Sequence, residues 1–161
     1  MPEPVNVPEL SKIDRQRLAQ AGIDLERKSR CGSYLQMDQD MIHAECEESE
    51  IEVLPYKQAM EKYTWLKEFT WKAVSPDKDE ITKYVAAQKE QNGYVIIAHK
   101  GSKNVLPIQT CLFLGRDRIQ HVHNIIIAEE GAELHIISGC ASGSHGGKGG
   151  AHYGISEFYI K

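Results

Sequence analysis

The sequence predicts an α+β fold in two parts, a mainly helical N-terminal region over residues 1–92 and a strand-rich region over residues 93–161. Three observations support this prediction. Apolar residues recur every three or four positions in the first part, and short β-branched runs between turn residues make up the second. A six-residue pattern also occurs twice in the second part, which favours a solenoid of stacked repeats over a sandwich or barrel.

The first part contains four segments with helical signals, one of which is a short segment near residues 24–30. Residues 8–11 (PELS) open the first, and residues 56–71 place most of their apolar side chains at helical spacing. Residues 75–77 (SPD) are typical of the start of another helix, which residues 92–93 (NG) end. Residues 51–54 (IEVL) predict one short strand between these helices.

The second part contains runs that are typical of short strands. Each is rich in β-branched or aromatic residues and is bounded by glycine or charged turn residues. Residues 96–101 (IIAHKG) recur as residues 126–131 (IIAEEG), 30 positions later, and a cysteine follows each copy at nearly the same distance. The predicted strands cover residues 94–99, 106–114, 122–128, 134–138 and 153–160.

Composition and charge exclude several classes of protein. The net charge is −4 and no run of lysine or arginine is present, so the chain has no electrostatic footprint for nucleic acid. No apolar run approaches the ~20 residues of a membrane span. The first residues, MPEPVNVPELSK, lack the pattern of a secretory signal. We therefore expect a cytoplasmic protein that contacts neither nucleic acid nor a membrane.

Two motifs suggest chemistry by their residue types. The glycine-rich loop at residues 139–150 contains Gly147-Lys148, but Gly149 stands where a P-loop needs Ser or Thr. His121 and His123 point to the same face of a predicted strand, so both can reach one metal ion, as in a cupin. The acidic ligand of that motif is not at its expected place. A metal-dependent enzyme that uses His121, His123 and another ligand stays open as an alternative.

A third group of residues gathers metal-ligating and nucleophilic side chains within a short stretch. Cys140 follows Gly139 at the edge of a predicted strand, beside the glycine-rich loop, where a thiol would be accessible. We expect neighbouring imidazolium or backbone N–H groups to lower its pKa and make it nucleophilic, which suits the acceptance of persulfide sulfur. Thiolate, imidazole and carboxylate are also ligands for iron or zinc. The group comprises His135, Cys140, His145, His152 and Glu157.

The residues around Cys140 resemble the SufB/SufD family of iron–sulfur assembly scaffolds, most closely its archaeal-type members. The segment IIIAEEGAELH at residues 125–135, the Gly139-Cys140 pair and HYGISEF at residues 152–158 follow the family pattern. That pattern is a strand, an E-x-G-A turn, a strand ending in Gly-Cys, a variable loop, and a strand carrying His and Glu. The similarity extends back to about residue 50 and is most specific over residues 124–158.

The resemblance implies a fold and a function. The expected fold is the N-terminal part of the family architecture, a helical region followed by the first coils of a right-handed parallel β-helix. The expected role is a non-enzymatic scaffold on which an iron–sulfur cluster is held transiently. Cys140 stands at a family cysteine implicated in accepting sulfur, with His145 and His152 as supporting residues. Glu157 matches a family glutamate that faces the interior of the β-helix.

The family also implies three partners. They are a SufC-type ABC ATPase, a second SufB/SufD-type scaffold and a sulfur donor system. Relative to the family, the chain stops at Lys161, before the later coils and the segment that binds the ATPase. An unfinished stack exposes the backbone groups of its last strand, so we expect self-association through residues 154–160.

Three functional hypotheses follow from the sequence. The first is a scaffold fragment for iron–sulfur assembly with Cys140 as sulfur acceptor. The second is the cupin-like metal enzyme, with His121 and His123 as ligands and His135 as a weaker candidate. The third is a β-solenoid interaction module without chemistry. Loss of persulfide loading in a Cys140→Ser variant separates the first hypothesis from the others.

Overall fold

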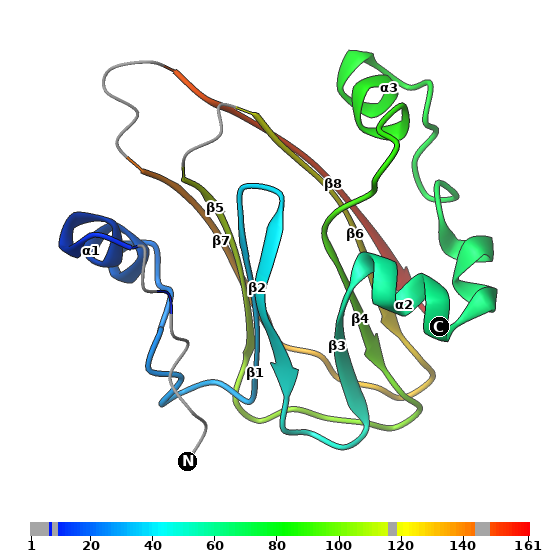
Figure 1. Cartoon of the computed structure of the whole chain (residues 1–161). Helices are drawn as coiled ribbons and strands as arrows, with labels where there is room; N and C mark the ends of the chain where they lie inside the picture. Colours follow the sequence, from blue (N-terminus) through cyan, green and yellow to red (C-terminus); the bar gives the residue numbers. More distant parts are fainter. Residues whose placement is uncertain (1–6, 8–9, 116–118, 144–148) are drawn as a thin grey trace.

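The computed structural model describes residue 7 and residues 10–115, 119–143 and 149–161, in which eight strands form two four-stranded sheets (Figure 1). In the first sheet the strand order is β2–β1–β5–β7, and in the second it is β3–β4–β6–β8. The first sheet comprises β1 (Gly32–Met37), β2 (Asp40–Cys46), β5 (Ile108–Leu114) and β7 (Ile136–Ser142). The second sheet comprises β3 (Ile51–Pro55), β4 (Tyr94–Ala98), β6 (Ile119–Ala128) and β8 (Ala151–Ile160).

Both sheets are mixed. The pairs β1/β2 and β3/β4 are antiparallel, whereas β1/β5, β5/β7, β4/β6 and β6/β8 are parallel. From β4 onward the chain alternates between the two sheets. The two copies of the six-residue pattern lie side by side, because Ile96 pairs with Ile126 and Ala98 with Ala128. β-branched side chains of the two copies therefore stack in the same columns of the second sheet.

The predicted fold class is wrong. Residues 32–55, which belong to the part expected to be helical, form β1, β2 and β3, and their antiparallel pairs make two mixed sheets rather than a parallel β-helix. All six residues of β1 are buried, so its sequence shows no period-two alternation. The edge strand β2 is largely exposed and acidic, so its composition resembles that of a loop. The division of the chain into two domains at residue 92 stays a prediction, although each sheet takes strands from both sides of that residue.

The helices are shorter than their sequence signals suggest. Ser11 caps α1 (Lys12–Gln20) by accepting from the Asp14 N–H. The segment predicted as one helix divides at Tyr63 into α2 (Tyr56–Lys62) and a 3₁₀ helix, η1 (Thr64–Phe69). The next helix, α3 (Glu80–Ala86), begins after Asp79 and not at residues 75–77, because Asp79 and Thr82 form a capping box.

The helices cover the outer faces of the sheets and leave the inner faces to pack on each other. Figure 1 shows α1 beside the first sheet, with α2 and α3 on the far side of the second. Each of the three interfaces has its own apolar cluster. Between the sheets lie Tyr34, Ile51, Val53, Ile96, Ile108, Leu112 and Ile126. Leu18, Ile23, Leu35 and Phe113 lie under α1, and Tyr56, Ala59, Leu66, Val95, Ile125 and Ile127 lie under α2 and η1.

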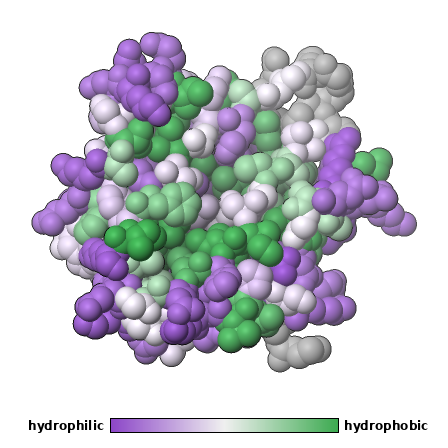
Figure 2. Space-filling model, turned by 180° about the vertical axis from the view of Figure 1, so that it is seen from behind, coloured by the Kyte–Doolittle hydropathy of each residue, from purple (hydrophilic) through white to green (hydrophobic). Residues whose placement is uncertain are grey.

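The strands β7 and β8 each have one neighbour and form one edge of their sheets, opposite β2 and β3. Their positions leave apolar side chains in contact with solvent: Phe158 is 59% exposed and Ile160 is 76% exposed. Figure 2, a view from behind, shows hydrophobic residues gathered across the middle of that face. In the part of the chain that the structure describes, no helix is long and apolar enough to cross a membrane.

Candidate functional site

Cys140 lies on the edge strand β7 and lines a cavity between the two sheets. It pairs with Leu112 of β5, whose side chain belongs to the core between the sheets. The cavity has a volume of about 250 Å³ and takes residues from both sheets. Cys140 is an exposed residue, so a reaction partner can reach its thiol from the edge. The lining residues are Leu112, Leu114, Gln120, Cys140, Ala141, Ser142, Gly150 and His152.

A fixed hydrogen-bond chain orients His152 toward Cys140. The amide Nε2 of Gln120 donates to the carbonyls of Asp38 and Phe113, at 2.6 and 3.3 Å. Its Oε1 is therefore turned toward His152 Nδ1, 2.8 Å away, and as an acceptor it requires Nδ1 to carry the proton. The unprotonated Nε2 of His152 then lies 4.0 Å from the Cys140 Sγ. The arrangement places a base beside the thiol.

Gln120 is the member of this site that sequence reasoning missed. It is completely buried and pairs in register with His152 across the parallel strands β6 and β8. A glutamine within a strand that is otherwise mostly apolar is a signal for a buried polar contact, because buried amides need partners. That signal marks the residue but does not reveal which partner it has.

The expected lowering of the Cys140 pKa is wrong. Both residues are accessible from the sheet edge, but part of each side chain is desolvated at the cavity. This desolvation raises the pKa of the Cys140 thiol and lowers the pKa of His152. At neutral pH the pair is therefore a thiol and a neutral imidazole. A neutral imidazole can accept the thiol proton during a reaction, so His152 suits the role of a general base.

Glu157 lies in a second site, on the opposite face of β8. Its carboxylate accepts hydrogen bonds from four successive backbone N–H groups, those of residues 71–74, at 2.7 to 3.2 Å. It also accepts from the Tyr159 hydroxyl at 2.9 Å and pairs with His123 Nε2 at 2.7 Å. The resemblance implied that Glu157 faces the interior, but it is held between the outer face of the second sheet and the segment after η1.

The pair of Glu157 and His123 is a carboxylate and a neutral imidazole. Burial opposes ionisation of Glu157, but hydrogen bonds from His123, Tyr159 and the backbone of Trp71 and Ala73 lower its pKa. Burial lowers the pKa of His123 and outweighs its attraction to Glu157. The His123 ring lies between Tyr56 and Trp71, with ring centroids 5.5 and 4.2 Å away. This site fastens residues 71–74 to the sheet.

The remaining histidines that the structure describes do not assemble into a metal site. His121 lies on the outer face with His123, but its Nε2 is 3.2 Å from the Glu90 carbonyl and its ring contacts Tyr84. His135 precedes β7, where its N–H donates to Asn104 Oδ1. Within the described residues, no group of three His, Cys, Asp or Glu side chains is arranged to hold a metal ion. His145 lies outside the described residues.

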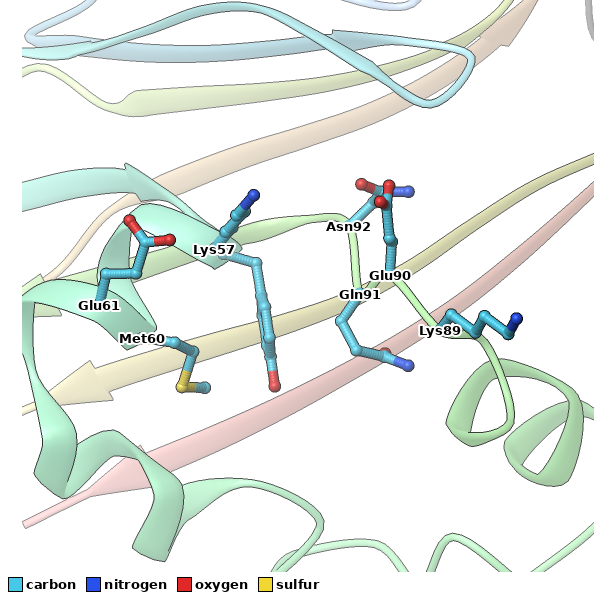
Figure 3. Close-up of a pocket in the computed structure, with 8 residues that line it drawn as sticks. Lys57, Met60, Glu61, Lys89, Glu90, Gln91 and Asn92 are labelled. Atoms are coloured by element: carbon cyan, nitrogen blue, oxygen red, sulfur yellow. The ribbon is translucent and has the colours of Figure 1, made fainter.

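A larger cavity lies on the outer side of the second sheet, between α2 and the segment that leads into β4. Figure 3 shows side chains from both segments around it. The cavity has a volume of about 450 Å³. Lysines and glutamates of both segments line it, so its positive and negative charges balance. It shares Tyr56 with the His123 site but does not reach Cys140. Its residues are Tyr56, Lys57, Met60, Glu61, Lys89, Glu90, Gln91 and Asn92.

Comparison with known proteins bears out the resemblance expected from the residues around Cys140. The chain is 47% identical over 149 residues to a protein of Archaeoglobus fulgidus described as "Iron-sulfur cluster assembly SufBD family protein". It is 42% identical over 157 residues to a protein of Methanothermobacter thermautotrophicus with the same description. These alignments cover 92% and 95% of the chain but only 40% and 38% of the relatives. No family model matches the chain.

Proposed function

Because this chain is homologous to about two fifths of an iron–sulfur cluster assembly SufBD family protein, we propose that it contributes a sulfur-accepting segment to an assembly scaffold. The observation that supports this function best is the Cys140–His152–Gln120 chain in the cavity between the sheets. The iron–sulfur cluster is the product assembled on such a scaffold rather than a resident cofactor of this chain. The proposed role is binding and transfer of sulfur and is not enzymatic turnover.

The sulfur transfer uses groups that lie together at the cavity. His152 Nε2 accepts the proton of the Cys140 thiol, and the resulting thiolate attacks the terminal sulfur of a donor persulfide. A new S–S bond forms at Cys140 Sγ while the S–S bond of the donor breaks. The donor departs as a thiolate, and Cys140 becomes a persulfide. No net oxidation occurs, because the sulfane sulfur passes from one thiol to another.

We expect the Cys140→Ser variant to lose persulfide loading. A serine hydroxyl cannot form the S–S bond, so label from a cysteine desulfurase supplied with ³⁵S-cysteine should fall to background on this chain. The matched control is Cys111→Ala, since burial raises the pKa of Cys111 to about 12 and leaves it 1% exposed. Undiminished loading of Cys140→Ser would by itself show that Cys140 is not the acceptor.

We expect the Cys140 thiol to react more slowly in the His152→Ala variant than in the wild type. A positioned base contributes roughly 10²–10⁴-fold to proton transfer, so alkylation of Cys140 by iodoacetamide at pH 7 should slow by at least about tenfold. The rate of the variant should recover at high pH, where the thiolate forms without a base. His135→Ala is the control, because His135 is not among the residues that line the cavity. Identical pH–rate profiles for wild type and His152→Ala would contradict a role as base.

The proposed partners follow from the family and from the sheet edges. We propose that the full-length relatives of this chain assemble with a SufC-type ATPase and a second SufB/SufD-type scaffold, and that a persulfide donor approaches Cys140. Self-association through β8 stays a prediction, which the exposed Phe158 and Ile160 support. An interaction module without chemistry is the alternative if neither Cys140 nor His152 affects sulfur loading.

A further inference from the structure

Two other cysteines lie together at the opposite end of the first sheet from Cys140. Cys46 is the last residue of β2 and pairs across the antiparallel ladder with Gly32, the residue after Cys31. The Glu47 N–H donates to the Cys31 carbonyl at 2.8 Å, which continues the ladder by one position. Cys31 and Cys46 are therefore diagonal neighbours on adjacent strands. Residues offset in this way have Cα atoms about 6 Å apart, within the span of a disulfide. Regular strands would place them on opposite faces, but Cys31 precedes β1 and packs on the same inner apolar cluster as Cys46.

Gly32 provides the space in which the Cys46 sulfur lies. A Cβ atom at position 32 would be 3.1 Å from Cys46 Sγ and 3.2 Å from Ile108 Cγ1. The Cys46 sulfur therefore lies against Gly32, and both cysteines contact the same apolar cluster between the sheets. A residue with a side chain at position 32 would displace the sulfur. Contact with this one cluster places both thiols on the inner side of the first sheet.

Polar groups surround the Cys31 thiol. The Cys31 thiol donates to the Leu106 carbonyl at 2.8 Å, and Asn104 Nδ2 lies 3.8 Å from the Cys31 sulfur. A hydrogen bond from Cys46, with a further one from Asn104, lowers the pKa of Cys31, although burial and the charge of Glu48 act in the opposite direction. The same hydrogen bond and burial raise the pKa of Cys46. Cys31 is only 5% exposed, whereas Cys46 is partly exposed.

We propose that Cys31 and Cys46 form a redox-active dithiol, which a small disulfide such as oxidised glutathione converts reversibly to an intramolecular disulfide. In the first step, the accessible Cys46 thiol attacks glutathione disulfide, and an S–S bond forms at Cys46 Sγ. The S–S bond of glutathione disulfide breaks, and the first glutathione leaves as a thiol with the proton of Cys46. In the second step, the Cys31 thiolate attacks Cys46 Sγ and displaces the second glutathione. The two cysteines lose two protons and two electrons, and the glutathione disulfide gains them. The pair acts independently of the sulfur-accepting role proposed for Cys140.

The test uses the chain in the Cys140→Ser background, so that the exposed Cys140 does not react. Incubation with oxidised glutathione should lower the mass by two hydrogen atoms and leave one titratable thiol, that of Cys111. Peptide mapping should link Cys31 to Cys46, and reduced glutathione should restore both thiols. The oxidised protein should also unfold at a higher temperature, because the bond shortens the free loop of the unfolded chain.

Single variants separate a dithiol from two unrelated thiols. Cys31→Ala should stop at a mixed disulfide of glutathione with Cys46, because the thiol that displaces glutathione is gone. Cys46→Ala should leave the buried Cys31 unmodified, and Cys111→Ala should form the disulfide as the parent does. A parent protein that keeps all its thiols, or that accumulates stable glutathione adducts without the internal bond, would overturn the proposal.

Discussion

Replacing Glu157 by glutamine should lower the free energy of unfolding by about 3 kcal/mol or more, which is a large fraction of the stability of a small domain. Glu157 is 1% exposed, and its carboxylate accepts from four backbone N–H groups, a tyrosine hydroxyl and His123. A glutamine side chain places an NH₂ group among these donors. At least two buried donors then lose their acceptor, and residues 71–74 lose their attachment to β8.

Urea denaturation followed by circular dichroism at pH 7 measures this effect. The matched control is Glu130→Gln, because Glu130 forms a solvent-exposed ion pair with Lys100 at 2.6 Å. Exposed pairs contribute about 0–1 kcal/mol, so the control should unfold close to the wild type. Equal losses in both variants would show that the network around Glu157 adds little to stability.

The same site makes stability depend on pH. The folded pKa of His123 is lowered, so the unfolded chain binds a proton that the folded chain does not as the pH falls below about 6.5, and stability declines. The folded pKa of Glu157 is also lowered. The contribution of Glu157 to stability is complete above about pH 4.3 and is lost as the pH falls through the folded pKa. The Glu157→Gln variant should lack the second, more acidic phase of this decline.

Replacing Gly93 by alanine should lower the free energy of unfolding by about 3 kcal/mol or more, as much as the replacement of Glu157. Gly93 has φ of +118°, and a Cβ atom there would lie 2.5 Å from the His123 carbonyl oxygen and 2.6 Å from Asn124 Oδ1. These neighbours belong to the buried strand β6 and have no room to move. The Gly93 carbonyl also accepts from the Tyr34 hydroxyl and the Tyr56 N–H, at 2.8 and 2.9 Å. A shift of this residue disturbs both sheets.

The Gly101→Ala variant separates the cost of backbone strain from the cost of a steric clash of the new Cβ atom. Gly101 also has positive φ, at +72°, but no atom lies within 4 Å of the Cβ position. Its substitution should cost about 1 kcal/mol, the usual penalty for alanine in this region of backbone conformation. Thermal and urea unfolding of the two variants provide the comparison. Equal losses would assign the whole effect at Gly93 to its backbone angle.

Much of the strand-rich part could be predicted from the sequence. Its strands are buried on one or both faces, and burial selects the β-branched residues that identify them. The repeated IIA segments, which are residues 96–98 and 126–128, pair with each other in the second sheet. By contrast, β1 is buried throughout and β2 is an acidic edge, so neither shows the alternation that identifies a strand. Pairing between β1 and β5 joins segments about 75 residues apart, and local patterns carry no information about such contacts.

The candidate site shows the same division between local and distant information. Sequence proximity grouped Cys140, His152 and Glu157, but the structure brings only the first two together. His152 and Glu157 are five positions apart on one strand, so the period of two already places them on opposite faces. That argument was available from the sequence. The partners of Glu157 come from residues 71–74, which no local pattern connects to β8.

The opposite faces of β8 also have a consequence for how such a protein can change over evolutionary time. His152 belongs to the cavity face, whereas Glu157 belongs to the anchoring face. Substitution of His152 leaves the hydrogen bonds of Glu157 to residues 71–74 intact, because the two side chains point to opposite faces. Selection can therefore change the base beside Cys140 while the contacts that fasten residues 71–74 to the sheet are retained.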